Sequence, residues 1–187
     1  MSAVEIVPYD ERWPSEFEAI AAHLRQGLGE LALRIDHIGS TSVPDLPAKD
    51  IIDIQITVAA LDERLISAMT VLGYPLREGF DRDDPPPGAP ALEGDWKKML
   101  FHAPPGERRM NIHARVQGRP NQRLALLFRD YLRSHPPAAA SYAALKRLLA
   151  EHLADTDVYP DVKEPAVHLI YLAAEAWAAA TGWQPEG

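Results

Sequence analysis

The amino-acid sequence predicts an α+β fold, in which a mixed or mostly antiparallel sheet of about four to five strands carries flanking helices and a helical C-terminal third follows. Two observations predict it. Residues 50–58 alternate strictly between apolar and polar side chains, as a half-buried strand does, whereas residues 121–180 show helical spacing. The length of 187 residues, with 47% hydrophobic and 25% charged residues, suits one globular domain. Within this single domain, 1–187, we expect a sheet-containing core over 1–117 and a helical extension over 118–187.

The first helix is predicted to begin at Trp13 and to end near Gly27 or Gly29. Pro14 suits a first helical turn, and glycine commonly ends a helix. Residues 31–38 then predict a strand. Apolar residues recur at helical spacing on one face of the predicted helix, at Phe17, Ile20, Ala21 and Leu24.

The clearest strand covers residues 50–58 and is rich in β-branched side chains. Residues 61–72 predict a short helix that ends at Gly73. One face of the strand is apolar and the other polar: Ile52, Ile54, Ile56 and Val58 against Asp53, Gln55 and Thr57.

A long irregular loop is predicted over 81–95, because it holds three consecutive prolines and two glycines. Residues 96–102 and 109–116 then predict two strands joined as a hairpin by the turn APPGE. The remaining residues predict three helices, over 121–133, 138–153 and 165–180.

The composition excludes several classes of function. Lys and Arg number 19 against 27 Asp and Glu, a formal net charge of −8, so the chain is a poor non-specific binder of nucleic acid or anionic membrane. Cysteine is absent, which excludes disulfides and thiolate metal sites. No secretory signal and no run of about 18 apolar residues is visible, so a cytoplasmic location is expected. The sequence leaves the oligomeric state open.

Polar side chains on two predicted strands are the main indication of a site. Asp53 and Gln55 share one face of the central strand, and Asn111, His113 and Arg115 share one face of the hairpin strand. If the two strands are neighbours, all five side chains lie on one surface and form a polar cleft. The alternative is a sheet face that simply meets solvent, which antiparallel sheets commonly have.

The loop Gly39-Ser40-Thr41-Ser42 precedes the central strand and is a candidate anion site. Glycine allows close approach of the backbone, and hydroxyls with free amides form the kind of cradle that phosphates occupy. Lys49 lies just downstream and supplies a compensating charge. The alternative is an ordinary turn.

A Gly-Ser pair followed about a dozen residues later by an Asp-bearing strand resembles the nucleotidyltransferase superfamily. That resemblance implies phosphates on Gly39 and Ser40 and a Mg²⁺ ion on Asp53, which would be the catalytic carboxylate. Gln55 stands where a second carboxylate is usual, and an amide is a poorer Mg²⁺ ligand. The later strand offers no acid either, so a third carboxylate would have to come from the loop at Asp81, Asp83, Asp84 or Asp95.

The stretch HIGSTSVPDLPAKDIIDIQITV, residues 37–58, is closer still to the GrpB-like family of uncharacterised bacterial proteins. Asp45 replaces a glycine of that pattern and Asp50 a proline. The resemblance implies a nucleotidyltransferase-like core with added helices, related to a domain fused to dephospho-CoA kinase in some bacteria. Other matching pieces run in order along nearly the whole chain: Val7 to Asp10 with Trp13 and Phe17, Asn111 to His113, Phe128 to Arg133, Tyr142 to Lys146, and Lys163.

Two functions follow as hypotheses. In the first, the protein binds a nucleotide or a phosphorylated small molecule and transfers a nucleotidyl group with Mg²⁺ at Asp53. In the second, it is a catalytically degenerate binding or scaffold module that lacks the metal-binding acids. In both, the residues expected to bind phosphate or substrate are Gly39, Ser40, Thr41, Ser42, Lys49, Gln55, His113, Arg115 and Lys163.

Overall fold

The computed structural model describes residues 4–89, 92, 94–155 and 157–185. Four strands form one sheet in the order β1-β2-β4-β3. Strand β2 pairs antiparallel with β1 and parallel with β4, and β4 pairs antiparallel with β3, so the sheet is mixed. The predicted α+β class and the hairpin are confirmed. The strand bounds are Arg34–Ile38 (β1), Ile52–Val58 (β2), Met99–His102 (β3) and Met110–Val116 (β4).

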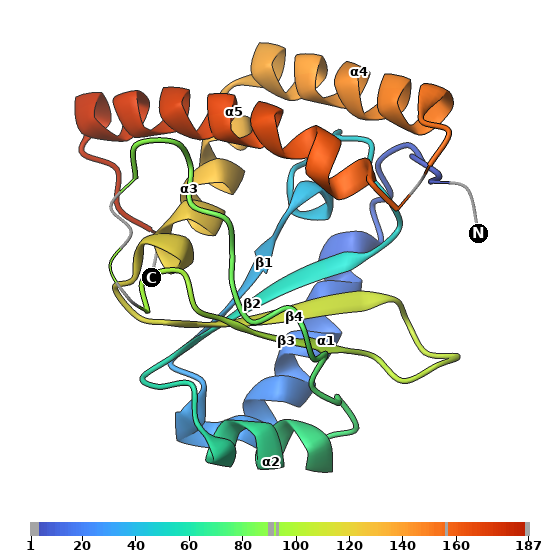
Figure 1. Ribbon diagram of the computed structural model, residues 1–187. Coiled ribbons are helices and arrows are strands. Elements are labelled where there is room, and N and C mark those ends of the chain that lie inside the picture. The colour runs from blue at the N-terminus through green and yellow to red at the C-terminus, as the bar shows by residue number, and fades with distance from the viewer. Residues whose placement is uncertain (1–3, 90–91, 93, 156, 186–187) are drawn as a thin grey trace.

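Five α-helices surround the sheet (Figure 1): α1 (Trp13–Leu28), α2 (Glu63–Val71), α3 (Pro120–Ser134), α4 (Pro136–His152) and α5 (Tyr159–Thr181). Two short 3-10 helices cover Gly29–Leu31 and Ser40–Ser42. Helix α5 begins six residues before the predicted start at Pro165, because Pro160 occupies its first turn. Pro165 lies inside the helix, where packing of α5 against α3 and α4 holds the helical backbone.

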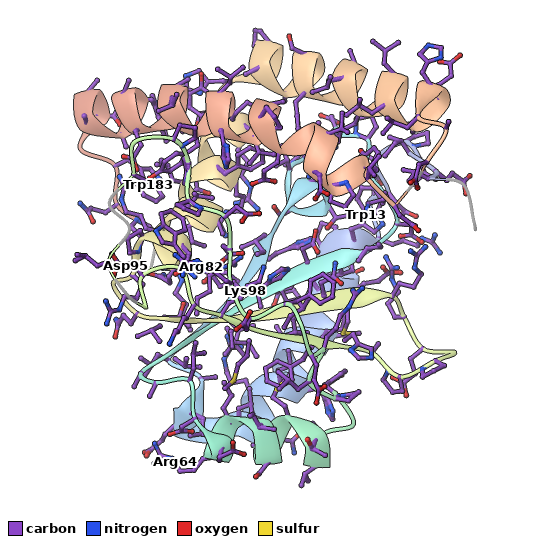
Figure 2. The ribbon with its side chains drawn as sticks, viewed as in Figure 1. Trp13, Arg64, Arg82, Asp95, Lys98 and Trp183 are labelled. Atoms are coloured by element: carbon purple, nitrogen blue, oxygen red, sulfur yellow. The ribbon has the colours of Figure 1, made fainter. Side chains whose placement is uncertain are left out.

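The main core lies between one face of the sheet and helices α1 and α2. The apolar face of β2 is fully buried there, as its alternation predicts. Trp13 opens α1 at the edge of this core and donates from its indole N–H to Asp50, 2.8 Å away (Figure 2). The same core includes Phe17 and Leu24 of α1 and Leu65 and Met69 of α2.

The polar face of the sheet is also covered. Helix α3 packs across β1, β2 and β4, and α4 and α5 form a further layer beyond it (Figure 1). Gln55 is 0% exposed and Thr57 is 2% exposed. The alternative of a sheet face open to solvent is therefore wrong, because the C-terminal helices fold back over that face.

A second apolar cluster joins this helical layer to the loop after β1. It contains Val43 and Leu46 of the loop with side chains of α3 and α4, among them Leu132 and Ala143. The loop therefore sits between sheet and helices with its backbone fixed. No helix among the described residues has the length and apolar character needed to cross a bilayer.

Candidate functional site

Gly39 places the loop directly on the side chain of Asp53. Its φ of +70° lies in a region that favours glycine. A Cβ atom at this position would stand 2.5 Å from Asp53 Oδ2, too close for any side chain. Residue 39 must therefore be glycine for two independent reasons, and the Gly-Ser pair and the strand aspartate predicted from sequence are in contact.

Two of the loop hydroxyls hold the loop itself. Thr41 is buried, and its Oγ1 lies 3.0 Å from Nε2 of His37 and donates to the carbonyl of Ile51. Ser42 Oγ donates to the carbonyl of Gly39 at 2.6 Å. Arg133 of α3 donates twice to the carbonyl of Ser42. Ser40 is the partly exposed hydroxyl of the three, so it is the one that a ligand can reach.

Lys146 is the residue that sequence reasoning left out of the site. It lies on α4 with only 3% of its surface exposed, and its Nζ donates to Ser40 Oγ at 2.9 Å and to the carbonyl of Pro47 at 2.5 Å. Burial, reinforced by the nearby charge of Lys163, lowers the pKa of Lys146 to about 7. In the sequence, Lys146 ends the stretch from Tyr142 that resembles the GrpB-like family, and this was the available indication of a role in the site. An ion pair on a helix surface explained the same position equally well.

Two further lysines approach the same place from other elements. Lys163 of α5 donates to the hydroxyl of Tyr142 at 3.3 Å, and the Lys49 ammonium lies 5.0 Å from the ring centroid of Tyr159. Burial and the charge of Lys163 lower the pKa of Lys49. Both lysines also act electrostatically on Asp53. The site therefore gathers cations from the loop before β2, from α4 and from α5.

Asp53 itself is partly exposed beneath the loop. Its Oδ1 accepts a hydrogen bond of 2.8 Å from Asn111 Nδ2 on the neighbouring strand β4, as the register of the two strands requires. Burial raises the pKa of Asp53, against the effect of that hydrogen bond and of Lys163. The predicted juxtaposition of Asp53 and Asn111 is confirmed.

The remaining predicted polar residues form a separate, paired cluster further along the strands. Gln55 donates to the carbonyl of Gln122 and accepts from Arg115, which also pairs with Asp83 at 2.7 Å. His113 lies 3.5 Å from Arg115, and burial holds its pKa well below the usual value. These side chains already satisfy one another inside the protein.

Among the described acids of the proline-rich loop, Asp83 is the one that reaches this cluster. Lys98 (labelled in Figure 2) pairs with it at 2.6 Å, in addition to Arg115. Burial acts to raise the pKa of Asp83, but the charges of Arg115 and Lys98 outweigh it and hold the pKa well below its usual range. Asp95 pairs with Arg119 instead.

The donor set beside Asp53 does not fit Mg²⁺. This ion prefers several anionic or carbonyl oxygens in octahedral geometry. Among the described residues, no group of three His, Asp or Glu side chains could hold a metal. The amide of Asn111 presents its N–H₂ group to Asp53, and the ammonium groups of Lys49 and Lys163 act on the same carboxylate. Ammonium groups repel a cation, so the surroundings of Asp53 favour an anion.

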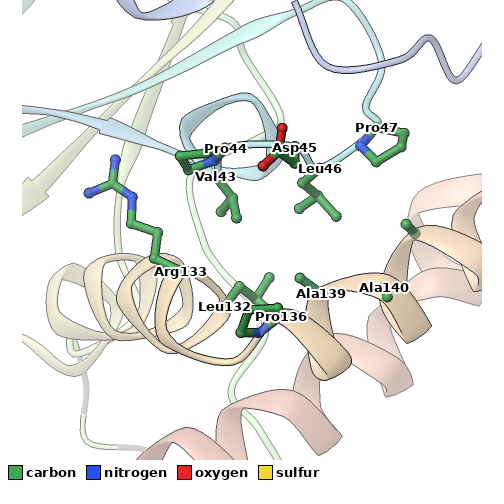
Figure 3. Close-up of a pocket in the computed structure, with 11 residues that line it drawn as sticks. Val43, Pro44, Asp45, Leu46, Pro47, Leu132, Arg133, Pro136, Ala139 and Ala140 are labelled. Carbon is green, nitrogen blue, oxygen red and sulfur yellow. The ribbon is translucent and has the colours of Figure 1, made fainter.

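A cavity of about 570 Å³ adjoins the loop on the side away from the sheet (Figure 3). Val43 and Leu46 point into it from the loop, facing Leu132 and Ala139 at the junction of α3 and α4. Arg133 lies at its rim and also lines a second cavity, of about 260 Å³, beside His37. Both cavities flank the loop that carries Ser40.

These features define an α+β protein whose Gly-Ser loop, strand aspartate and three lysines meet at one partly exposed place. A sequence profile of the GrpB protein family matches residues 3–172, and the chain belongs to that family. The crystal structure of the conserved protein GrpB from Enterococcus faecalis is similar with a TM-score of 0.75 and 31% identity, over 92% of this chain and 99% of that one.

Longer proteins contain a related sequence. A dephospho-CoA kinase of Mycolicibacterium paratuberculosis is 42% identical over 202 residues, which cover 97% of this chain and 48% of that protein. The chain thus spans about half the length of the dephospho-CoA kinases that it matches. A distant likeness to the Cid1 poly(U) polymerase, with a TM-score of 0.47 and 10% identity over 77% of the chain, is too weak to assign an activity.

Proposed function

We propose that this protein binds a nucleotide or another phosphorylated small molecule, with the phosphate held at Ser40 by Lys49, Lys146 and Lys163. One observation supports the proposal above all. Three lysines from separate elements converge on one partly exposed hydroxyl loop, in a chain whose formal net charge is −8. Because like charges repel, such a cluster is costly unless an anion uses it.

The neighbouring groups give each lysine a fixed position. The ring of Tyr159 lies under Lys49, and the hydroxyl of Tyr142 accepts from Lys163. The hydrogen bond to the carbonyl of Pro47 fixes the ammonium group of Lys146 in the position where it donates to Ser40. Fixed donors lose little conformational freedom when the phosphate binds. Gly39 allows the loop that carries Ser40 to lie directly against Asp53.

The resemblance to nucleotidyltransferases supports a second candidate function, transfer of a nucleotidyl group with Mg²⁺ on Asp53. The contact between Gly39 and Asp53 favours it, because the superfamily pattern places the phosphate loop over the metal-binding strand. The single carboxylate and the paired state of Gln55, Arg115 and Asp83 favour a binding module instead. On this interpretation the paired cluster positions β2 and β4 and does not touch the ligand.

Isothermal titration calorimetry tests the binding function directly. The panel holds ATP, dephospho-CoA and inorganic pyrophosphate, the second because the longer relatives are named dephospho-CoA kinases. We expect at least one to bind, and Lys163→Gln to weaken it by about tenfold, the scale of one nearby charge. Lys97→Gln is the matched control, since Lys97 is exposed and distant in sequence from the loop. Equal loss in both variants, or binding of none of the three probes, would contradict the proposal.

A further inference from the structure

The positive charges around Ser40 replace a metal ion. We infer that this site takes its phosphate without a divalent cation, the ammonium groups of Lys49, Lys146 and Lys163 supplying the charge that Mg²⁺ supplies elsewhere. The inference rests on the proposed phosphate-binding function and specifies how the ligand is held.

The first step concerns the oxygens available to a cation. Asp53 offers one carboxylate, and its Oδ1 already accepts from Asn111. Gln55, at the next position on the same face of β2, uses its carbonyl oxygen for Arg115 and its amide for the carbonyl of Gln122. Asp83 accepts from Arg115, Lys98 and Asn121. All of these side-chain oxygens except Asp53 Oδ2 therefore accept a hydrogen bond from a cation or an N–H group of the protein.

The second step concerns the charges. A divalent cation beside Asp53 would meet Lys49 and Lys163 at the same carboxylate, and Lys146 lies within the same electrostatic environment. Three ammonium groups against one carboxylate give these surroundings a net positive charge, which disfavours a divalent cation. A phosphate dianion reverses every one of these interactions: the three ammonium groups attract it, and Asp53 repels it. The site is therefore more favourable for a bare phosphate than for its magnesium complex.

The third step gives Asp53 a different role. With no metal to hold, its carboxylate balances the lysines in the unliganded protein and opposes an incoming phosphate. Neutralising it should then tighten anion binding, whereas neutralising a metal ligand abolishes it. Asp53→Asn keeps the shape of the side chain, and an amide oxygen can still accept from Asn111 Nδ2, so the contact with Gly39 is preserved.

The experiment titrates ATP and pyrophosphate into the wild-type protein and Asp53→Asn at pH 6, in EDTA and in excess MgCl₂. The pKa of Lys146 is about 7, so this lysine is mostly charged at pH 6. We expect binding in EDTA that magnesium leaves unchanged or weakens, and roughly tenfold tighter binding by Asp53→Asn. Circular dichroism and thermal unfolding verify that the variant is folded.

The outcomes separate this inference from the function on which it rests. Binding that requires magnesium and is lost in Asp53→Asn overturns metal-free recognition but leaves phosphate binding in place. Binding of neither probe in either buffer overturns the phosphate site itself. Binding in EDTA that Asp53→Asn weakens by tenfold or more, in a folded variant, also overturns the charge-balancing role of Asp53.

Discussion

Replacement of Lys146 by methionine should change the stability of the protein in opposite directions at low and high pH. The side chain is 3% exposed, and its pKa falls from 10.5 in the unfolded chain to about 7 in the fold. This difference corresponds to roughly 5 kcal/mol of cost for burying the charged form. Below pH 7 both states are protonated, so the whole cost is present.

The sign follows from proton uptake. Between pH 7 and 10.5 the unfolded chain binds more protons at this lysine than the folded protein, so the stability of the wild type rises with pH across this window. Methionine removes the buried charge but leaves Ser40 Oγ and the carbonyl of Pro47 without their donor. The loss of these hydrogen bonds lowers the stability by about 1–3 kcal/mol. Lys146→Met should therefore be more stable than the wild type by about 2–4 kcal/mol at pH 6.

At pH 10 the wild-type lysine is neutral in the fold, but about 1 kcal/mol of the burial cost remains because the unfolded lysine is still largely protonated, so the variant should be less stable by up to about 2 kcal/mol. Urea unfolding followed by tryptophan fluorescence at both pH values measures the difference, with Lys97→Met as control. A stability difference of the same sign and size at pH 6 and pH 10 would refute the reasoning, because it would place the change in packing alone.

Three further variants test the contacts that support the site, and urea unfolding measures the stability of each. Gly39→Ala should destabilise the protein by about 2–4 kcal/mol, since a Cβ there meets Asp53 Oδ2 at 2.5 Å and the φ is +70°; an effect below 0.5 kcal/mol would contradict the contact. Asp83→Asn leaves Arg115 and Lys98 without an anion, so it should cost about 2–4 kcal/mol at pH 7 and less at pH 2, where the carboxyl of the unfolded chain is protonated; equal costs at the two pH values would rule out the charge. Ile54→Ala, in the fully buried face of β2, should cost about 3–4 kcal/mol at any pH, and a cost below 1 kcal/mol would show that the core collapses around the cavity.

Local patterns were sufficient to predict the sheet. The alternation of β2 identified its buried face, and the neighbouring pair Asp53 and Asn111 followed once the two strands were taken as partners. The start of β1 was predicted three residues too early, because Gly29 turns the backbone into a 3-10 helix before the strand begins at Arg34. The start of this strand depends on the conformation of one glycine, which the periodicity of apolar residues does not reveal.

Tertiary pairing limited the prediction of the site. Arg115 was expected to meet phosphate, and its alternation placed it on the correct face, but the identity of its partner depends on how the loop bearing Asp83 folds back. Lys146 looked like an ordinary helix-surface lysine, because nothing near it in sequence reveals the carbonyl of Pro47 that receives it. Burial of a charged side chain is decided by distant segments.

The contacts that build the site span long stretches of chain. Asp53 and Asn111 are separated by 58 residues, and Ser40 and Lys146 by 106. Closing such loops costs entropy before any contact is gained, so pairings of this range form late in folding. Strands β1 and β2 follow one another in the chain and can associate early, yet the three lysines come together only after α4 and α5 have docked. We therefore expect the proposed ligand to bind only after the whole fold has formed. In a refolding experiment, binding should appear after the spectroscopic signal of sheet formation, in the slowest phase.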